Sequence, residues 1–210
     1  MQITTKKFRL TGLMPILGSV ALDKEIYTNY LATKGKTDEE RERAHGDVDE
    51  VMDNPEGKIT GFYRDRETGN VILKGYQIKG FLKEAAKALK DQIGLTAYVS
   101  KIDNLVFIEE NNIPVMRDGE WVKNPDGFLE RPLRGETAQG PRVSLAKSEV
   151  VEEGWYLDIT VKVVENKKTA KSVEMSMDIV EQLLEYGALK GLLQWRNAGY
   201  GSFKTEEITE

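Results

Sequence analysis

The chain contains no cysteine and only one histidine among its 210 residues. It therefore forms no disulfide and offers no thiolate for catalysis, and a single histidine makes a structural zinc site unexpected. No apolar run approaches the roughly 18 residues of a membrane span, and the first residues lack the apolar core of a signal peptide. We expect a cytoplasmic protein that binds no membrane, no metal and no other cofactor.

The chain also lacks a net positive charge: acidic residues outnumber basic ones, so the net charge is −5 and the isoelectric point is about 5.2. Proteins that bind nucleic acid are usually basic. The acidity is local, however: residues 38–56 hold nine acids and two bases, whereas 131–147 hold four bases and one acid. Residues 187–204 hold three bases and no acid. Individual faces can therefore be positive although the whole chain is not.

Hydrophobic periodicity predicts an alternation of strands and helices. We expect strands over 6–14, 99–109, 144–164 (two strands) and 192–206, a hairpin over 58–73, and helices over 77–93 and 176–186. Gly69 should supply the positive φ of the hairpin turn, Gly94 should end the first helix, and Ser176 should cap the second.

This order predicts one domain over residues 1–210 of the α+β class, with a ferredoxin-like or RNA-recognition-like antiparallel sheet and helices on one face. Two segments depart from that pattern. Residues 20–57 predict an acidic helical insertion, and residues 110–143 predict an extended loop or hairpin.

The C-terminal segment 191–203, GLLQWRNAGYGSF, combines glycines with one arginine. Glycines let a backbone approach a partner and expose N–H groups to an anion. Arginine forks onto phosphate, asparagine bonds a sugar or base, and tyrosine stacks on a base for about 1–3 kcal/mol. The candidate contacts are Arg196, Asn197, Gly199, Tyr200 and Gly201. The alternative is a glycine bulge in a terminal strand, with Trp195 and Tyr200 simply packed.

A second candidate site is the start of the helix over 75–86, which follows a strand. A helix N-terminus presents free N–H groups and partial positive charge, which suit a phosphate. Lys79 and Lys83 add charge to this end. The alternative is a surface amphipathic helix whose lysines are solvated.

Three segments together resemble the CRISPR RAMP superfamily, and they occur in the order of that family. Residues 8–19 (FRLTGLMPILGS) are similar to its first strand and following glycine, and 63–83 (YRDRETGNVILKGYQIKGFLK) to its strand, turn, strand and helix start. Residues 191–203 are similar to its glycine-rich loop. The resemblance implies an RNA-recognition-like fold and a non-catalytic subunit that grips the backbone of single-stranded RNA or DNA. Its partners would be other RAMP-type subunits or copies of itself.

By the same resemblance, Arg131, Arg134 and Arg142 fall on the extended hairpin with which such subunits grip or kink a strand. The chain departs from the family at the helix start, where Tyr76 to Ile78 replace a Pro-Ser-Ser sequence.

Two alternatives stay open at this point. A RAMP-type endoribonuclease needs a catalytic residue, and the aspartate of RNA-cutting subunits falls near Thr60 or Gly61, so Asp53 is the nearest weak candidate. His45 is the candidate general acid or base. The other alternative is a protein-interaction module, such as a phage-borne mimic or inhibitor of a CRISPR subunit, which the acidic composition favours.

Overall fold

The structure, a computed structural model, describes residues 2–22, 59–137, 140–165 and 175–209, with the backbone alone over 133–137 and 140–145. Residues 23–57 of the predicted acidic insertion lie outside the described residues, and so do His45 and Asp53.

The largest sheet is built on two long antiparallel strands, β1 (Gln2–Gly12) and β13 (Trp155–Glu165). They pair from Gln2 opposite Glu165 to Thr11 opposite Tyr156. The strand β14 (Phe203–Glu207) pairs with the other side of β1. Of three further short strands, two pair with β13 and the third pairs with one of these two. These are β7 (Val106–Ile108), β9 (Met116–Arg117) and β10 (Glu120–Trp121).

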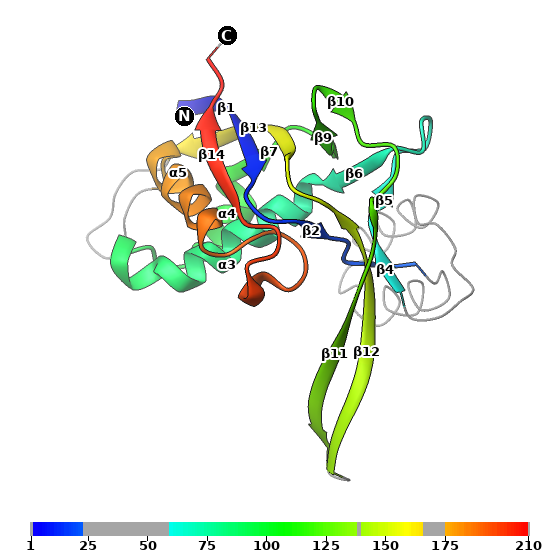
Figure 1. Ribbon diagram of the computed structural model, residues 1–210. Coiled ribbons are helices and arrows are strands. Elements are labelled where there is room, and N and C mark those ends of the chain that lie inside the picture. The colour runs from blue at the N-terminus through cyan, green and yellow to red at the C-terminus, as the bar shows by residue number, and fades with distance from the viewer. Residues whose placement is uncertain (1, 23–58, 138–139, 166–174, 210) are drawn as a thin grey trace.

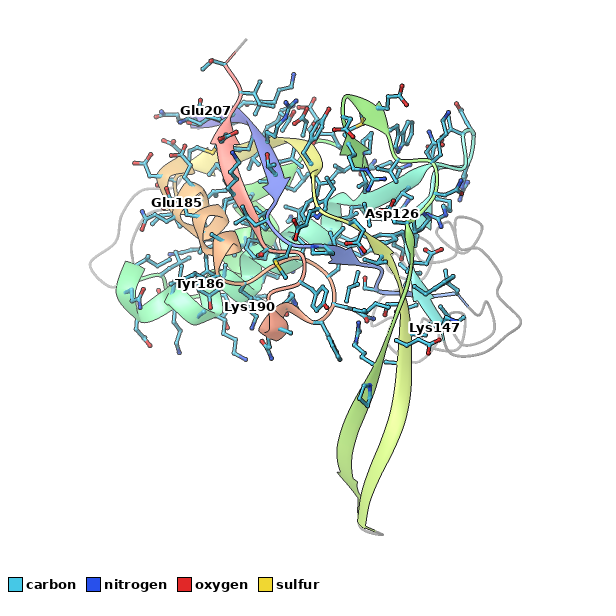
Figure 2. All side chains as sticks on the ribbon, viewed as in Figure 1. Asp126, Lys147, Glu185, Tyr186, Lys190 and Glu207 are labelled. Atoms are coloured by element: carbon cyan, nitrogen blue, oxygen red, sulfur yellow. The ribbon has the colours of Figure 1, made fainter. Side chains whose placement is uncertain are left out.

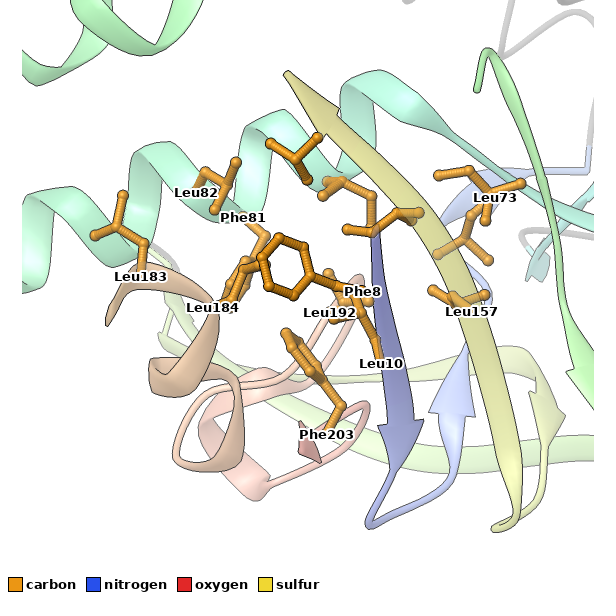
Figure 3. Close-up of a cluster of buried hydrophobic side chains, with 14 of the residues drawn as sticks. Phe8, Leu10, Leu73, Phe81, Leu82, Leu157, Leu183, Leu184, Leu192 and Phe203 are labelled. Atoms are coloured by element: carbon orange, nitrogen blue, oxygen red, sulfur yellow. The ribbon is translucent and has the colours of Figure 1, made fainter. Parts of the chain in front are cut away.

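Three helices pack on one face of this sheet (Figure 1). The sequence predicted the helical face and two of these three helices. They are α3 (Gly75–Ile93), α4 (Tyr98–Leu105) and α5 (Met177–Glu185). Alternate residues of β13 are buried beneath them, because successive strand side chains point to opposite faces. The core joins both layers, with Phe8 and Leu157 of the sheet near Phe81 and Leu184 of the helices (Figure 3). None of the helices in the described segments is long and apolar enough to cross a membrane.

The signals predicted for the ends of the two long helices are largely confirmed. The helix α3 begins where the side chain of Gln77 accepts a hydrogen bond from the backbone N–H of Lys74 (2.8 Å), and it ends at Gly94 with φ of 66°. Ser176 occupies the cap position of α5, but its hydroxyl makes no capping hydrogen bond. Gly69 has the expected positive φ, 72°.

The strand predicted over 99–109 is wrong. Residues 98–105 form α4, and only 106–108 are a strand, β7. The β-branched Val99 and Ile102 favoured a strand, yet Tyr98, Ile102 and Leu105 recur at helical spacing and pack against the core. Tertiary packing of that stripe decided the conformation.

Residues 110–143, expected as an extended loop or hairpin, divide into two parts. The first holds β8 (Asn112–Pro114) together with β9 and β10. The second enters a long antiparallel hairpin of β11 (Gly127–Thr137) and β12 (Gly140–Val151), which projects from the body (Figure 1). We refer to the end of this hairpin that joins the body as the hairpin root.

The hairpin root belongs to a second sheet, whereas the sequence predicted a single sheet. Its order is β11-β12-β4-β3, and β2 also pairs with β12. These added strands are short: β2 (Ile16–Leu17), β3 (Val20–Ala21) and β4 (Ile59–Gly61). A third sheet joins β5 (Tyr63–Arg64), β6 (Val71–Lys74) and β8.

A buried carboxylate fixes the place where these sheets meet. Glu149 of β12 accepts hydrogen bonds from the N–H of Phe62 (3.0 Å) and from Nη2 of Arg64 (2.8 Å). A side chain at Gly61 would overlap the Glu149 carboxylate, and one at Gly18 would overlap the backbone of Gly61. Close backbone contact and a buried ion pair therefore set the geometry of this junction together.

Replacing Glu149 tests how much the junction contributes to stability. Glu149→Ala leaves the buried Arg64 cation and the Phe62 N–H without their acceptor, so we expect the free energy of unfolding to fall by about 3–5 kcal/mol in urea denaturation. The exposed pair of Glu130 with Lys147 (3.1 Å) provides the control. Glu130→Ala should cost less than about 1 kcal/mol. Equal losses in both variants would contradict the role given to the junction.

Candidate nucleic-acid interface

The glycine-rich segment forms a closed loop in the connection from α5 to β14. This C-terminal loop, residues 191–202, contains the short helix η2 (Arg196–Ala198) and follows η1 (Tyr186–Ala188). The N–H of Leu192 donates to the carbonyl of Gly201 (2.9 Å), and the N–H of Gly201 donates to the carbonyl of Pro15 (2.8 Å). These bonds tie the two ends of the loop to each other and to the body.

The glycines of the loop serve two different purposes. A Cβ at Gly191 would overlap the carbonyl oxygen of Tyr200, and one at Gly201 would overlap that of Leu192. Both glycines are needed for the loop to close on itself, so the space beside Gly201 is filled by the loop. Gly199 differs, because a Cβ there would meet nothing within 4 Å, and its φ is 88°. Of the two glycines named as candidate contacts, Gly199 has the open surface that a partner would need.

An arginine and two aromatic rings meet where the loop touches the hairpin root. The guanidinium carbon of Arg131, on β11, lies 3.7 Å from the centre of the Trp195 ring. The Tyr200 ring is 6.0 Å from the Trp195 ring and tilted by 54°. A cation over an indole face contributes about 1–2 kcal/mol when it is partly desolvated. This contact brings together Arg131 and Tyr200, which the sequence predicted separately, through Trp195, which had been left as a packing residue.

A side-chain amide continues this contact into the second sheet. Oε1 of Gln194 accepts hydrogen bonds from Nη2 of Arg131 (2.8 Å) and from the hydroxyl of Ser148 (3.2 Å). The Ser148 hydroxyl in turn lies 2.7 Å from that of Thr60. Thr60 is one of the two positions, with Gly61, near which the resemblance puts the aspartate of RNA-cutting subunits, and it contributes a hydroxyl to the base of the interface. The adjacent carboxylate, Glu149, is held by Phe62 and Arg64, and burial raises its pKa.

An open groove of about 1020 Å³ runs between the C-terminal loop and α3. Its charged lining consists of Lys87, Lys190 and Arg196 against one acid, Glu84. Figure 2 shows Lys190 beside the loop and Lys147 at the hairpin root. The remaining lining residues are neutral: Ala88, Leu193, Gln194, Trp195, Asn197 and Ala198. The groove therefore carries an excess of positive charge on a chain that is negative overall.

Arg196 has a partner within the protein. Its guanidinium forms a two-pronged ion pair with Glu84, in which Nη2 lies 2.9 Å from Oε1 and Nη1 contacts Oε2. The pair holds the loop against α3, so Arg196 contributes a neutralised contact to the groove where we expected a free cation. Asn197, the next residue, is exposed in the groove.

Lys79 and Lys83 face α4 and do not line the groove. Nζ of Lys79 donates to the carbonyl of Asp103 (3.1 Å), and Nζ of Lys83 pairs with the Asp103 carboxylate (2.5 Å). Lys87, one turn further along α3, lines the groove instead and was missed. The sequence shows that Lys87 lies four residues from Lys83 on the same helix. It does not show that the C-terminal loop packs beside Lys87 and makes it part of the groove.

Arg134 and Arg142 lie on the projecting part of the hairpin, where Arg134 is opposite Val143 and Gly135 is opposite Arg142. Their side chains are outside the described residues. Among the described segments, no three His, Asp or Glu side chains gather in a way that could hold a metal ion.

Two glycine substitutions test the division of roles in the loop. Gly191→Ala forces a methyl group into the loop backbone, and we expect the free energy of unfolding to fall by about 3 kcal/mol. Gly199→Ala meets no atoms and incurs only the strain of a left-handed backbone, about 1–2 kcal/mol. Urea denaturation of both variants measures the difference, and a larger loss for Gly199→Ala would refute the assignment.

Comparison with known proteins supports the fold and goes no further. No model of a known protein family matches the chain, and no curated protein matches it in sequence. A chain of a solved structure described as a type IV-B CRISPR complex aligns with 98% of this chain and 91% of its own length, with 9% identity and a TM-score of 0.51. A chain of the type III-B Cmr-beta bound to cognate target RNA aligns with 99% of this chain, with 11% identity and a TM-score of 0.49. This chain spans 60% of the length of that one. The α+β fold with antiparallel sheets is thus one that also occurs in a type IV-B CRISPR complex.

Proposed function

We propose that this protein is a RAMP-like subunit without catalysis of its own, which grips the backbone of single-stranded RNA, or of DNA, across the C-terminal loop and the hairpin root. One observation carries the proposal. The loop brings Trp195 and Tyr200 to Arg131, immediately beside a groove with surplus positive charge.

The two kinds of side chain match the two parts of a nucleotide. Lys87 and Lys190 have no carboxylate within ion-pairing distance among the described residues, so their charges are available for phosphates. Aromatic rings offer sequence-independent surfaces for bases. Asn197 supplies hydrogen bonds to a sugar or a base edge. Cations and aromatic rings side by side are the usual composition of a single-strand binding surface.

Binding without cleavage agrees with the chemistry at Thr60. A hydroxyl hydrogen-bonded to Ser148 offers neither a carboxylate for a metal ion nor a strong base. The neighbouring Glu149 is buried and already accepts two hydrogen bonds. Both features favour a subunit that holds a strand over one that cuts it.

Further subunits fit the same proposal. The strand β11 is the edge of its sheet, and the hairpin that contains it projects from the body. An edge strand offers backbone N–H and carbonyl groups to a neighbouring chain. We propose that copies of this protein, or other RAMP-type subunits, pack beside it along a bound strand.

The groove cations provide the direct test. We expect the double variant Lys87→Gln with Lys190→Gln to bind a fluorescent single-stranded oligouridine more weakly, with the salt dependence of log K reduced by about 1.4, because each lost phosphate contact removes about 0.7 for single strands. Fluorescence anisotropy across a series of salt concentrations measures both quantities. The control removes the same charge from Lys162 and Lys204, which pair with Glu109 and Glu206 outside the groove. Equal weakening by the control would show that the interface lies elsewhere.

The same assay separates the alternatives. Failure of the unmodified protein to bind either RNA or DNA at low salt would overturn the proposal and favour a protein-interaction module. Cleavage of the oligonucleotide that disappears in Asp53→Ala or His45→Ala would instead establish a ribonuclease.

A further inference from the structure

The guanidinium of Arg131 is buried without an anion. The residue is 4% exposed, and its Nη2 donates to the amide oxygen of Gln194. Its Nε and Nη1 are buried and have no hydrogen-bond partner, and no carboxylate among the described residues pairs with it. A cation is rarely buried unless an opposite charge accompanies it.

Two other arginines show how this protein satisfies such a group. Arg9 also lies over an aromatic ring, that of Tyr156 at 4.3 Å, and its Nε and Nη2 each donate to Asp158 at 2.7 Å. Arg64 is nearly as buried as Arg131, and its Nη1 also lacks a hydrogen-bond partner, but the Glu149 carboxylate accompanies its charge. Arg131 lies over an aromatic ring, as Arg9 does, and is buried, as Arg64 is. Unlike both, it has no carboxylate beside it among the described residues.

The unpartnered edge of Arg131 has the geometry of an anion site. Adjacent N–H groups of a guanidinium form a fork that matches two oxygens of a phosphate or a carboxylate. Burial lowers the pKa of Arg131, yet a guanidinium stays protonated at neutral pH, so the charge persists. An oxyanion that reached this edge would meet a cation with little competing water.

Trp195 covers the guanidinium, and its backbone is strained. Trp195 and Leu193 have φ of 55° and 61°, values that side-chain-bearing residues rarely adopt. Such strain concentrates at ligand clamps and switch regions. A change in conformation at Trp195, the residue that covers Arg131, would therefore relieve backbone strain.

We propose that Arg131, Gln194 and Trp195 form a closed phosphodiester site. In the free protein the Trp195 ring lies on the guanidinium. In the complex the ring leaves to stack on a nucleobase, and the Nε and Nη1 edge receives the adjacent phosphate. This inference rests on the proposed function, since the ligand is the same single strand, and it adds a binding residue that is hidden until the strand arrives.

The test compares Arg131→Met with Arg9→Met. Arg131→Met loses the contacts with Trp195 and Gln194 but also removes the cost of a buried cation without a counter-ion, so we expect little change in the melting temperature. The substitution should also weaken oligouridine binding about 10-fold or more, as expected for a charge-assisted hydrogen bond, and reduce the salt dependence of log K by about 0.7. Arg9→Met breaks an ion pair, so it should lower the melting temperature and leave the salt dependence unchanged.

Tryptophan fluorescence gives an independent measurement that does not depend on Arg131→Met folding. Titration with oligouridine should change the emission of the unmodified protein, and the change should disappear in Trp195→Phe. The other two tryptophans lie outside the groove, since Trp155 is fully buried in the core and the indole N–H of Trp121 donates to the carbonyl of Val71 (2.7 Å).

The outcomes distinguish this inference from the proposed function. An unchanged salt dependence in Arg131→Met, or an emission that does not respond to binding, would overturn the closed site while the groove lysines still weaken binding when replaced. A lower melting temperature with full RNA affinity would show that Arg131 is only a structural support. Absence of binding by the unmodified protein would overturn both.

Discussion

The candidate interface depends on the buried Glu149 carboxylate and on the backbone contacts around it. Glu149 lies on β12, the strand of the projecting hairpin that returns to the body, and it accepts hydrogen bonds from Phe62, between β4 and β5, and from Arg64 of β5. Ser148 and Thr60 pair directly beside it in the β12–β4 register. The hydroxyls of Ser148 and Thr60 are therefore positioned beside this junction, where the ion pair of Glu149 with Arg64 is buried.

The C-terminal loop reaches that junction with little freedom of its own. Gly191 and Gly201 let its two ends pass at backbone contact, Glu84 holds Arg196 against α3, and Gln194 is bonded to the hairpin root. What is left open is the surface between these attachments, which carries Lys87, Lys190 and Asn197. The loop is thus attached through some residues and exposes Asn197 beside two cations that lie outside it, Lys87 of α3 and Lys190.

Sequence reasoning succeeded where periodicity extended over many residues. The stripe that buries Ile78, Phe81 and Ala85 predicted α3, and the alternation after Trp155 predicted β13. It failed at the division into three sheets, because β2, β3 and β4 have two or three residues each and no period. The strand predicted over 99–109 failed because β-branched residues also pack well on a short buried helix.

At the candidate site, sequence reasoning identified residue types better than their partners. Arg131, Tyr200 and Asn197 were chosen for what arginine, tyrosine and asparagine can bind. Gln194 and Trp195 were missed, since their importance comes from Arg131, which is 63 residues from Gln194 along the chain. Arg196 was expected to be free because nothing local indicates Glu84, 112 residues away. Such pairings come from the tertiary fold and leave no short-range pattern.

The contact of Gly18 with the backbone of Gly61 has a consequence for how this fold can vary. A likeness in structure at 9% identity means that most side chains can be exchanged while the chain keeps its course. At Gly18 and Gly61, however, it is the absence of a side chain that matters, since a Cβ at Gly18 would overlap the backbone of Gly61 and one at Gly61 would overlap the Glu149 carboxylate. Substitutions at these two positions are therefore limited by volume, so that the junction tolerates a change of chemistry on the surface more readily than one added methyl group inside it.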